Sequence, residues 1–171
     1  MAMAFESLPV ELIADILSWV DLATLITLSY LSRRFHSITS DPSLNPWRGP
    51  ILRNLQDGVY DPSLKTLCVR YTVPKQNWID ILCLAKASFL LFEATLPNLK
   101  ELEWEECFRR RFLPGWRKWK KDGRRWKEAF MMYVLVLHML TSLCLIYIEY
   151  CIECGIAVAP LVPPMKHGQS K

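Results

Sequence analysis

Histidine is scarce in this sequence, and its scarcity limits the chemistry that the chain can perform. The three histidines, His36, His138 and His167, are far apart in the chain. None has a nucleophile motif, a glycine-rich phosphate loop or paired carboxylates beside it. We therefore expect no catalytic residues and no enzymatic activity of the chain's own.

A secretory signal is also lacking, because the amino terminus does not show the basic, apolar and small-residue regions of such a segment. The six cysteines lie in apolar or helical-looking stretches, which favours reduced thiols in a cytoplasmic or nuclear protein. Cys151 and Cys154 form one C-x-x-C pair, but a zinc site needs four ligands and only His167 is near. We expect no metal and no cofactor.

What the first forty residues have in excess is apolar surface. In "PVELIADILSWV" the residues Leu12, Ile13, Ile16 and Leu17 recur at three- and four-residue steps, which predicts a helix. Asp21 is placed to cap a second helix over residues 22–31, and a third would follow over residues 33–38. A unit of this size cannot bury all of these apolar side chains. The side chains left unburied predict a surface for a partner, unless the rest of the chain covers them.

The order of residues in this segment resembles an F-box. The resemblance covers about a quarter of the chain and rests on Leu8-Pro9, Glu11, Ile16-Leu17-Ser18, Asp21, Leu25, Leu28-Ser29 and Leu31-Ser32-Arg33-Arg34-Phe35. It implies a three-helix domain that binds a Skp-family adaptor and, through it, a cullin. The chain would then be the substrate-recruiting subunit of an SCF-type ubiquitin ligase. The adaptor contacts implied by the resemblance are Leu8, Pro9, Leu12, Ile16, Leu25, Leu28, Leu31, Arg34 and Phe35.

This segment departs from the family pattern at a few positions. Phe35 stands where many members have Trp, and Leu31-Ser32 replaces a Val-Cys pair, which are mild changes of size. The family's Leu-Trp after Asp-Pro-Ser is separated here into Leu44, Asn45, Pro46 and Trp47, which predicts a re-routed exit from the domain.

The middle of the chain is expected to be mostly helical. A short helix is predicted to end at Gly58, a short strand is predicted over residues 63–73, and a helix is predicted from Asn77. Residues 98–113 fit either a helix with Trp104, Phe108 and Phe112 on one stripe or a leucine-rich-repeat remnant over Leu99 to Cys107. The helix is favoured because acids gather early and bases late in the segment.

Acidic residues are almost absent between Arg109 and Lys127, where ten Lys and Arg accompany the single acid Asp122. Tryptophans alternate with these bases, a pattern typical of an amphipathic helix pair with its indoles inward. It also suits a surface for an acidic or phosphorylated peptide or for an anionic membrane. Nucleic acid is disfavoured, because no nucleic-acid-binding module surrounds the stretch. The candidate contact residues are Trp116, Arg117, Trp119, Lys120, Arg124 and Arg125.

Charge is missing altogether from Phe130 to Ile148. As a helix rising about 1.5 Å per residue, this run matches the hydrocarbon core of a membrane, about 30 Å thick. A membrane anchor would keep the F-box on the cytosolic side. The alternatives are a buried core helix and an aberrant end, since composition changes abruptly at Met131.

We therefore predict a mainly α-helical chain. The expected parts are an F-box domain over residues 4–46, a helical substrate-recognition or linker region over 47–128, an apolar helix over 129–150 and a flexible tail over 151–171. The alternatives are a small C-terminally anchored membrane protein with a vestigial F-box, and a truncated F-box protein that lacks a working substrate module.

Overall fold

A computed structural model describes residues 8–120 and 123–153 of the chain. In these ranges every regular element is a helix and none is a strand, which confirms the predicted fold class. The elements, in chain order, are α1 (Val10–Leu17), α2 (Leu22–Leu31), α3 (Arg33–Ser40), α4 (Arg48–Asp57), the 3₁₀ helix η1 (Pro62–Val69), α5 (Lys75–Leu84), α6 (Ala87–Phe92), α7 (Glu101–Arg111), the 3₁₀ helix η2 (Pro114–Trp119) and α8 (Trp126–Glu153).

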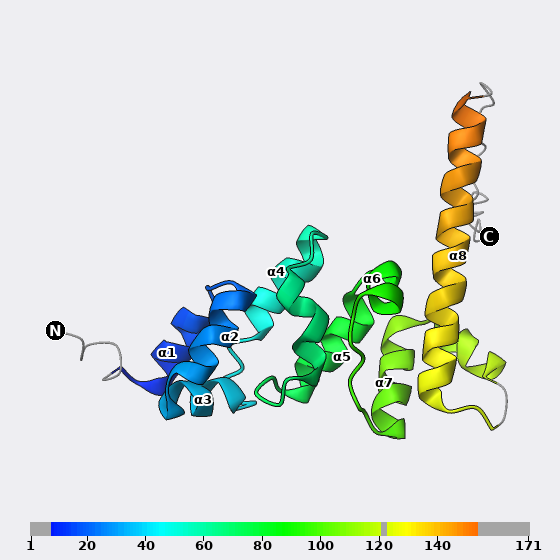
Figure 1. The fold of residues 1–171 in the computed structure, drawn as a ribbon. Coiled ribbons are helices and arrows are strands. Elements are labelled where there is room, and N and C mark those ends of the chain that lie inside the picture. Colours follow the sequence, from blue (N-terminus) through cyan, green and yellow to red (C-terminus); the bar gives the residue numbers. More distant parts are fainter. Residues whose placement is uncertain (1–7, 121–122, 154–171) are drawn as a thin grey trace, which may run out of the picture. The chain divides into compact units, whose positions relative to one another are not determined.

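Side-chain caps begin two of the first three helices. The Asp21 carboxylate accepts a hydrogen bond from the backbone N–H of Thr24 at 2.8 Å, which confirms its predicted role at the start of α2. The Ser32 hydroxyl accepts one from the N–H of Phe35 at 3.2 Å and separates α2 from α3. α3 contacts both α1 and α2, and Figure 1 shows the three side by side.

Trp47 closes the core of this three-helix segment. Its side chain is fully buried, and its indole N–H donates a hydrogen bond to the carbonyl oxygen of Thr39 at 2.8 Å. The two extra residues before it, Asn45 and Pro46, are absorbed in a turn where Asn45 has a φ of 36°. The chain therefore returns a tryptophan to the core in spite of the altered spacing.

The next segment confirms one prediction and corrects another. α4 ends at Gly58, as predicted, and this glycine has a left-handed φ of 69°. The predicted strand over residues 63–73 is wrong, because η1 occupies most of it. Asp61 caps the N–H of Ser63 at 2.7 Å and Pro62 starts the helix, so Leu64, Leu67 and Cys68 are buried on one face.

The helix predicted from Asn77 is present as two helices, α5 and α6. Ala85 and Lys86 between them have extended backbone, with ψ of 152° and 145°. The N–H of Lys86 donates to the hydroxyl of Tyr60 at 2.7 Å, which takes the place of a helical bond at this break.

α7 confirms the helix prediction for residues 98–113 in place of a leucine-rich-repeat remnant. Trp104, Phe108 and Phe112 are all buried, as the stripe required. At the start of the helix the carboxylate of Glu103 accepts a hydrogen bond from the backbone N–H of Lys100 at 2.6 Å. α7 packs against α5.

Two compact units divide the chain at a point inside α8. The first is Met1–Leu135 and the second is Val136–Lys171. The first unit runs across the predicted boundaries at residues 46 and 128 and includes the start of α8. Residues 4–7, Lys121, Asp122 and the tail from Cys154, with His167, lie outside the described residues.

Candidate functional site

α1 presents two adjacent apolar stripes, one to the core and one to solvent. Ile13 and Leu17 are fully buried, whereas Leu12 and Ile16 are 51% and 44% exposed. Each exposed residue directly precedes a buried one, Leu12 before Ile13 and Ile16 before Leu17. The apolar face of α1 is therefore wide enough to cover a core and to present a second surface. The rest of the described chain does not cover that surface.

The end of α2 and the residues before α1 carry further exposed apolar surface. Leu31 is 68% exposed, Pro9 is exposed, and Leu8 and Leu28 are half-buried. Arg34 joins the two ends of the segment, since its Nη2 donates to the carbonyl oxygen of Leu8 at 2.6 Å. This bond holds the residues before α1 against α3.

Leu25 and Phe35 are buried within the three-helix segment, although the resemblance placed them in the adaptor contact. Leu25 is 0% and Phe35 is 5% exposed. Their side chains face the shared interior of α1, α2 and α3, so they support the exposed residues from behind. The surface formed by Leu8, Pro9, Leu12, Ile16, Leu28, Leu31 and Arg34 is called the docking surface below.

Three exposed apolar side chains beside these residues escaped the sequence analysis. Val10, Trp19 and Tyr30 are 38%, 77% and 51% exposed. Of the three, Tyr30 lies in α2, which has apolar residues on every side, so that some of them had to face solvent. The guanidinium of Arg53 lies 6.0 Å from the centre of the Trp19 ring, which fixes that indole at the edge of the surface.

Comparison with known families agrees with this geometry. Residues 5–52 match the family model of the F-box-like domain, which is less than a third of the chain. The chain carries an F-box-like domain. Comparison with curated proteins and with solved structures gave no match.

The F-box-like domain ends at residue 52, inside α4, and so includes the buried Trp47. A domain of this kind supports binding to a Skp-family adaptor in general, and F-box proteins are generally noncatalytic adaptor subunits. Within the described residues, no group of three or more His, Cys, Asp and Glu could hold a metal ion.

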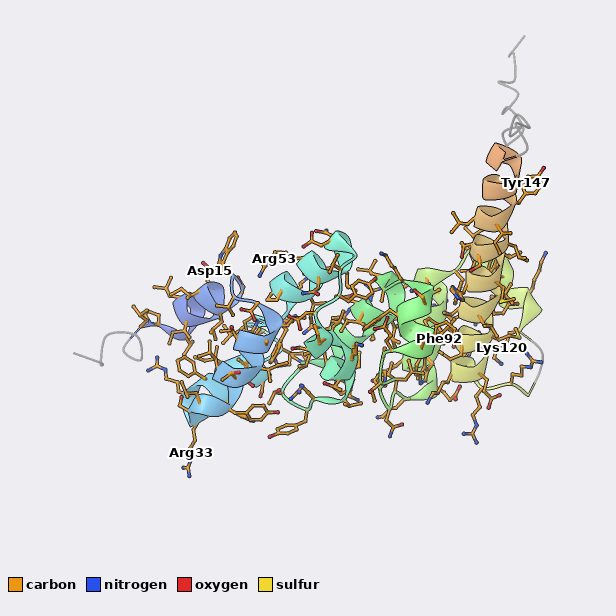
Figure 2. The ribbon with its side chains drawn as sticks, turned by 45° about the horizontal axis from the view of Figure 1, so that its top comes forward. Asp15, Arg33, Arg53, Phe92, Lys120 and Tyr147 are labelled. Carbon is orange, nitrogen blue, oxygen red and sulfur yellow. The ribbon has the colours of Figure 1, made fainter. Side chains whose placement is uncertain are left out.

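A shallow cavity of about 350 Å³ lies on the domain beside the docking surface. Ser29, Tyr30, Ser32, Arg33 and His36 line it. Arg33 is exposed and points away from the helices in Figure 2.

The cap of α2 is ionised. The hydroxyl and the backbone N–H of Thr24 both donate hydrogen bonds to the Asp21 carboxylate, and these bonds hold the pKa of Asp21 below its usual value. This carboxylate therefore remains ionised as the cap of α2.

Beyond the domain, the basic stretch places its indoles against the aromatic residues of α7 and α8. The rings of Trp116 and Phe112 are stacked with centroids 5.9 Å apart, and Trp126 lies 5.5 Å from Phe108. Both indoles are half-buried. This packing supports the interpretation that the tryptophans face inward.

The cations of this stretch lie around the aromatic rings. Arg117 forms an ion pair with Glu105 at 2.7 Å, and the Nζ of Lys120 lies 4.8 Å from the centre of the Trp126 ring. Arg125 is exposed and Arg124 is half-buried. The side chain of Trp119 lies outside the described residues.

Proposed function

We propose that this chain is a noncatalytic, substrate-recruiting subunit of an SCF-type cullin ubiquitin ligase. Its F-box-like domain would bind a Skp-family adaptor through the docking surface. The observation that carries this proposal is the exposure of Leu12, Ile16 and Leu31 on a domain whose interior is already filled. Removing apolar surface from water favours association, so an apolar partner surface is the natural cover.

The two ends of the docking surface would make different contributions. Leu12, Ile16, Leu28 and Leu31 supply apolar contacts from α1 and α2. The bond from Arg34 to the carbonyl of Leu8 keeps Leu8 and Pro9 at the margin, where they extend the same surface. Leu25 and Phe35 act as support, because their side chains are buried.

The region after the F-box-like domain would present the substrate. The side-chain amides of Asn45 and Asn77 are paired through two hydrogen bonds of 2.7 and 3.2 Å, and α4 contacts α5. These contacts join the exit of the domain to the helices after it, within the same compact unit. A substrate bound on α5 to α7 would therefore be held at a fixed distance from the adaptor.

Co-purification of the full chain with a Skp-family adaptor tests the proposal. Leu31→Asp places a charge in the docking surface and should reduce adaptor binding more than tenfold, because a buried unpaired carboxylate is costly. Leu84→Asp is the matched control, since Leu84 is 57% exposed and lies in α5, outside the F-box-like domain. Equal adaptor binding by the two variants, with helical content unchanged, contradicts the docking proposal.

Membrane anchoring is a second candidate, and α8 favours it. By length and composition, Trp126–Tyr147 could cross a membrane. The mean hydropathy is 2.1, and only 22% of the 18-residue window that defines the candidate span is buried. Tyr147 is 55% exposed and projects away from α8 in Figure 2. The F-box-like domain would then remain on the cytosolic side.

The packing of α8 limits this second candidate. Ala129, Phe130 and Val134 are fully buried in the first compact unit. The uncharged residues that remain, 135–148, number about 14 and extend about 21 Å as a helix, which is shorter than a hydrocarbon core of about 30 Å. A full span would require the start of α8 to leave the core. Carbonate extraction of membranes from expressing cells tests this: release of the chain excludes an integral anchor.

A further inference from the structure

We propose that a pocket between α7 and η2 binds an acidic peptide segment, taking one apolar side chain as an anchor and one neighbouring carboxylate at its rim. The inference rests on the proposed function, because it names the class of substrate that the receptor would recruit. The pocket has a volume of about 230 Å³ and is lined by Phe108, Arg109, Phe112, Leu113, Pro114 and Arg117.

The floor of the pocket is apolar and preformed. Phe108 and Phe112 are 1% and 5% exposed, and their ring centroids lie 4.8 Å apart. Tyr133 of α8 does not line the pocket but meets the Phe108 ring edge-on at 5.2 Å, so it supports the floor from behind. Pockets for drug-sized ligands have volumes of about 300–1,000 Å³, whereas this smaller pocket suits a single side chain such as leucine or phenylalanine.

The rim of the pocket supplies the charge. Arg117 is already paired with Glu105, whereas Arg109 is exposed and forms no ion pair with any residue in the described ranges 8–120 and 123–153. One unpaired guanidinium beside an apolar pocket matches one carboxylate beside an apolar side chain. The neighbouring carboxylate of Glu105 disfavours a dianionic phosphate at the same place.

The surroundings of the pocket argue against nucleic acid as the occupant. Bases bind to such surfaces by stacking on open aromatic faces. Here the aromatic faces are already in contact with other groups. Trp116 is stacked on Phe112. Two cations lie near the Trp126 ring, with the Nζ of Lys120 4.8 Å and the guanidinium of Arg117 5.9 Å from its centre.

Fluorescence anisotropy of the purified full chain with labelled peptides tests the proposal. The probe is a Gly-Ser peptide that carries one leucine with two glutamates on each side. We expect binding of this probe and about tenfold weaker binding, about 1.4 kcal/mol, in two altered peptides. Replacing the glutamates by glutamines removes the charge-assisted hydrogen bond to Arg109, and replacing the leucine by serine removes the apolar anchor. No binding, or equal binding of all three peptides, overturns the proposal.

A matched pair of variants separates the pocket from diffuse charge. Arg109→Gln should weaken binding of the probe about tenfold, because it removes the unpaired guanidinium. Arg125→Gln removes the same charge from an exposed arginine that does not line the pocket, and should change binding less than twofold. Equal losses in the two variants overturn the proposal, as does tighter binding of a phosphoserine peptide, phosphatidylserine vesicles or single-stranded RNA.

Adaptor binding by the same variants keeps this test distinct from that of the proposed function. Arg109→Gln should still co-purify with the adaptor, and Leu31→Asp should still bind the peptide. Absence of peptide binding by the unaltered chain, with adaptor binding retained, refutes the pocket. Absence of adaptor binding by the unaltered chain refutes the docking proposal and leaves the pocket standing.

Discussion

The indole N–H of Trp47 donates a hydrogen bond to the carbonyl oxygen of Thr39 at 2.8 Å, and both residues are fully buried. The bond joins the segment after the F-box-like helices to the last full turn of α3. It places a residue from the altered exit sequence at the centre of the domain. The stability of the docking surface therefore depends on a side chain that lies outside it.

Trp47→Phe should lower the free energy of unfolding of the full chain by about 1–3 kcal/mol. The variant removes the donor and leaves the buried carbonyl of Thr39 without this partner, while most of the apolar volume remains. Urea unfolding followed by circular dichroism measures the loss. Trp19→Phe is the control, because Trp19 is 77% exposed, and it should change stability by less than about 0.5 kcal/mol. Equal effects of the two variants would refute a structural role for the bond.

Asp21→Ala should destabilise the chain by about 1 kcal/mol at pH 7, the usual cost of losing an N-cap. The bonds from Thr24 hold the pKa of Asp21 below its usual 3.8 in the folded state. Because the pKa of Asp21 is lower in the folded state than in the unfolded state, its carboxylate stabilises the fold at pH values above the unfolded pKa. This stabilisation is lost as the pH falls through the folded pKa. The difference between Asp21→Ala and the unaltered chain should therefore shrink below about pH 4. A difference that is the same at pH 7 and pH 2.5 contradicts the assignment.

Cys68 should make the folded chain less stable in alkali. Burial raises the pKa of its thiol from 9.0 to about 12, so the folded state holds the proton more tightly than the unfolded state does. The stabilisation is complete below about pH 9 and is lost as pH rises toward 12. Urea unfolding at pH 7 and pH 10 in reducing buffer should show a smaller loss for Cys68→Ala than for the unaltered chain. Cys144→Ala, at an exposed cysteine, should behave like the unaltered chain, and an unchanged pH dependence in Cys68→Ala refutes the prediction.

Local patterns in the sequence were enough to predict the helices that have caps and one-sided apolar spacing. Asp21, Gly58 and the stripe from Trp104 to Phe112 mark α2, α4 and α7, because caps and periodicity act within a few residues. The strand over residues 63–73 was wrong for the same reason. The buried residues Leu64 and Leu67 are three apart, which is the period of η1, and the Asp61-Pro62 start favours this helix.

Contacts between distant residues were beyond local patterns. The bond from Lys86 to Tyr60 splits α5 from α6, and no spacing near Lys86 signals it. The burial of Leu25 and Phe35 likewise depends on how three helices meet, whereas spacing shows only that these residues are apolar. The pocket between α7 and η2 is lined by residues of one short stretch, but the Phe108 ring in its floor packs edge-on against Tyr133 from α8.

The two halves of α8 should respond differently to the same loss of apolar volume. Phe130 is fully buried, with its ring 5.5 Å from that of Trp104, so Phe130→Ala should lower the free energy of unfolding by about 3–5 kcal/mol. Leu143 is 58% exposed in the second compact unit, so Leu143→Ala should change it by less than about 0.5 kcal/mol. Urea unfolding of both variants makes the comparison. A large loss from Leu143→Ala would mean that a partner or another part of the chain covers the exposed half, and a small loss from Phe130→Ala would contradict the docking of α8 on α7.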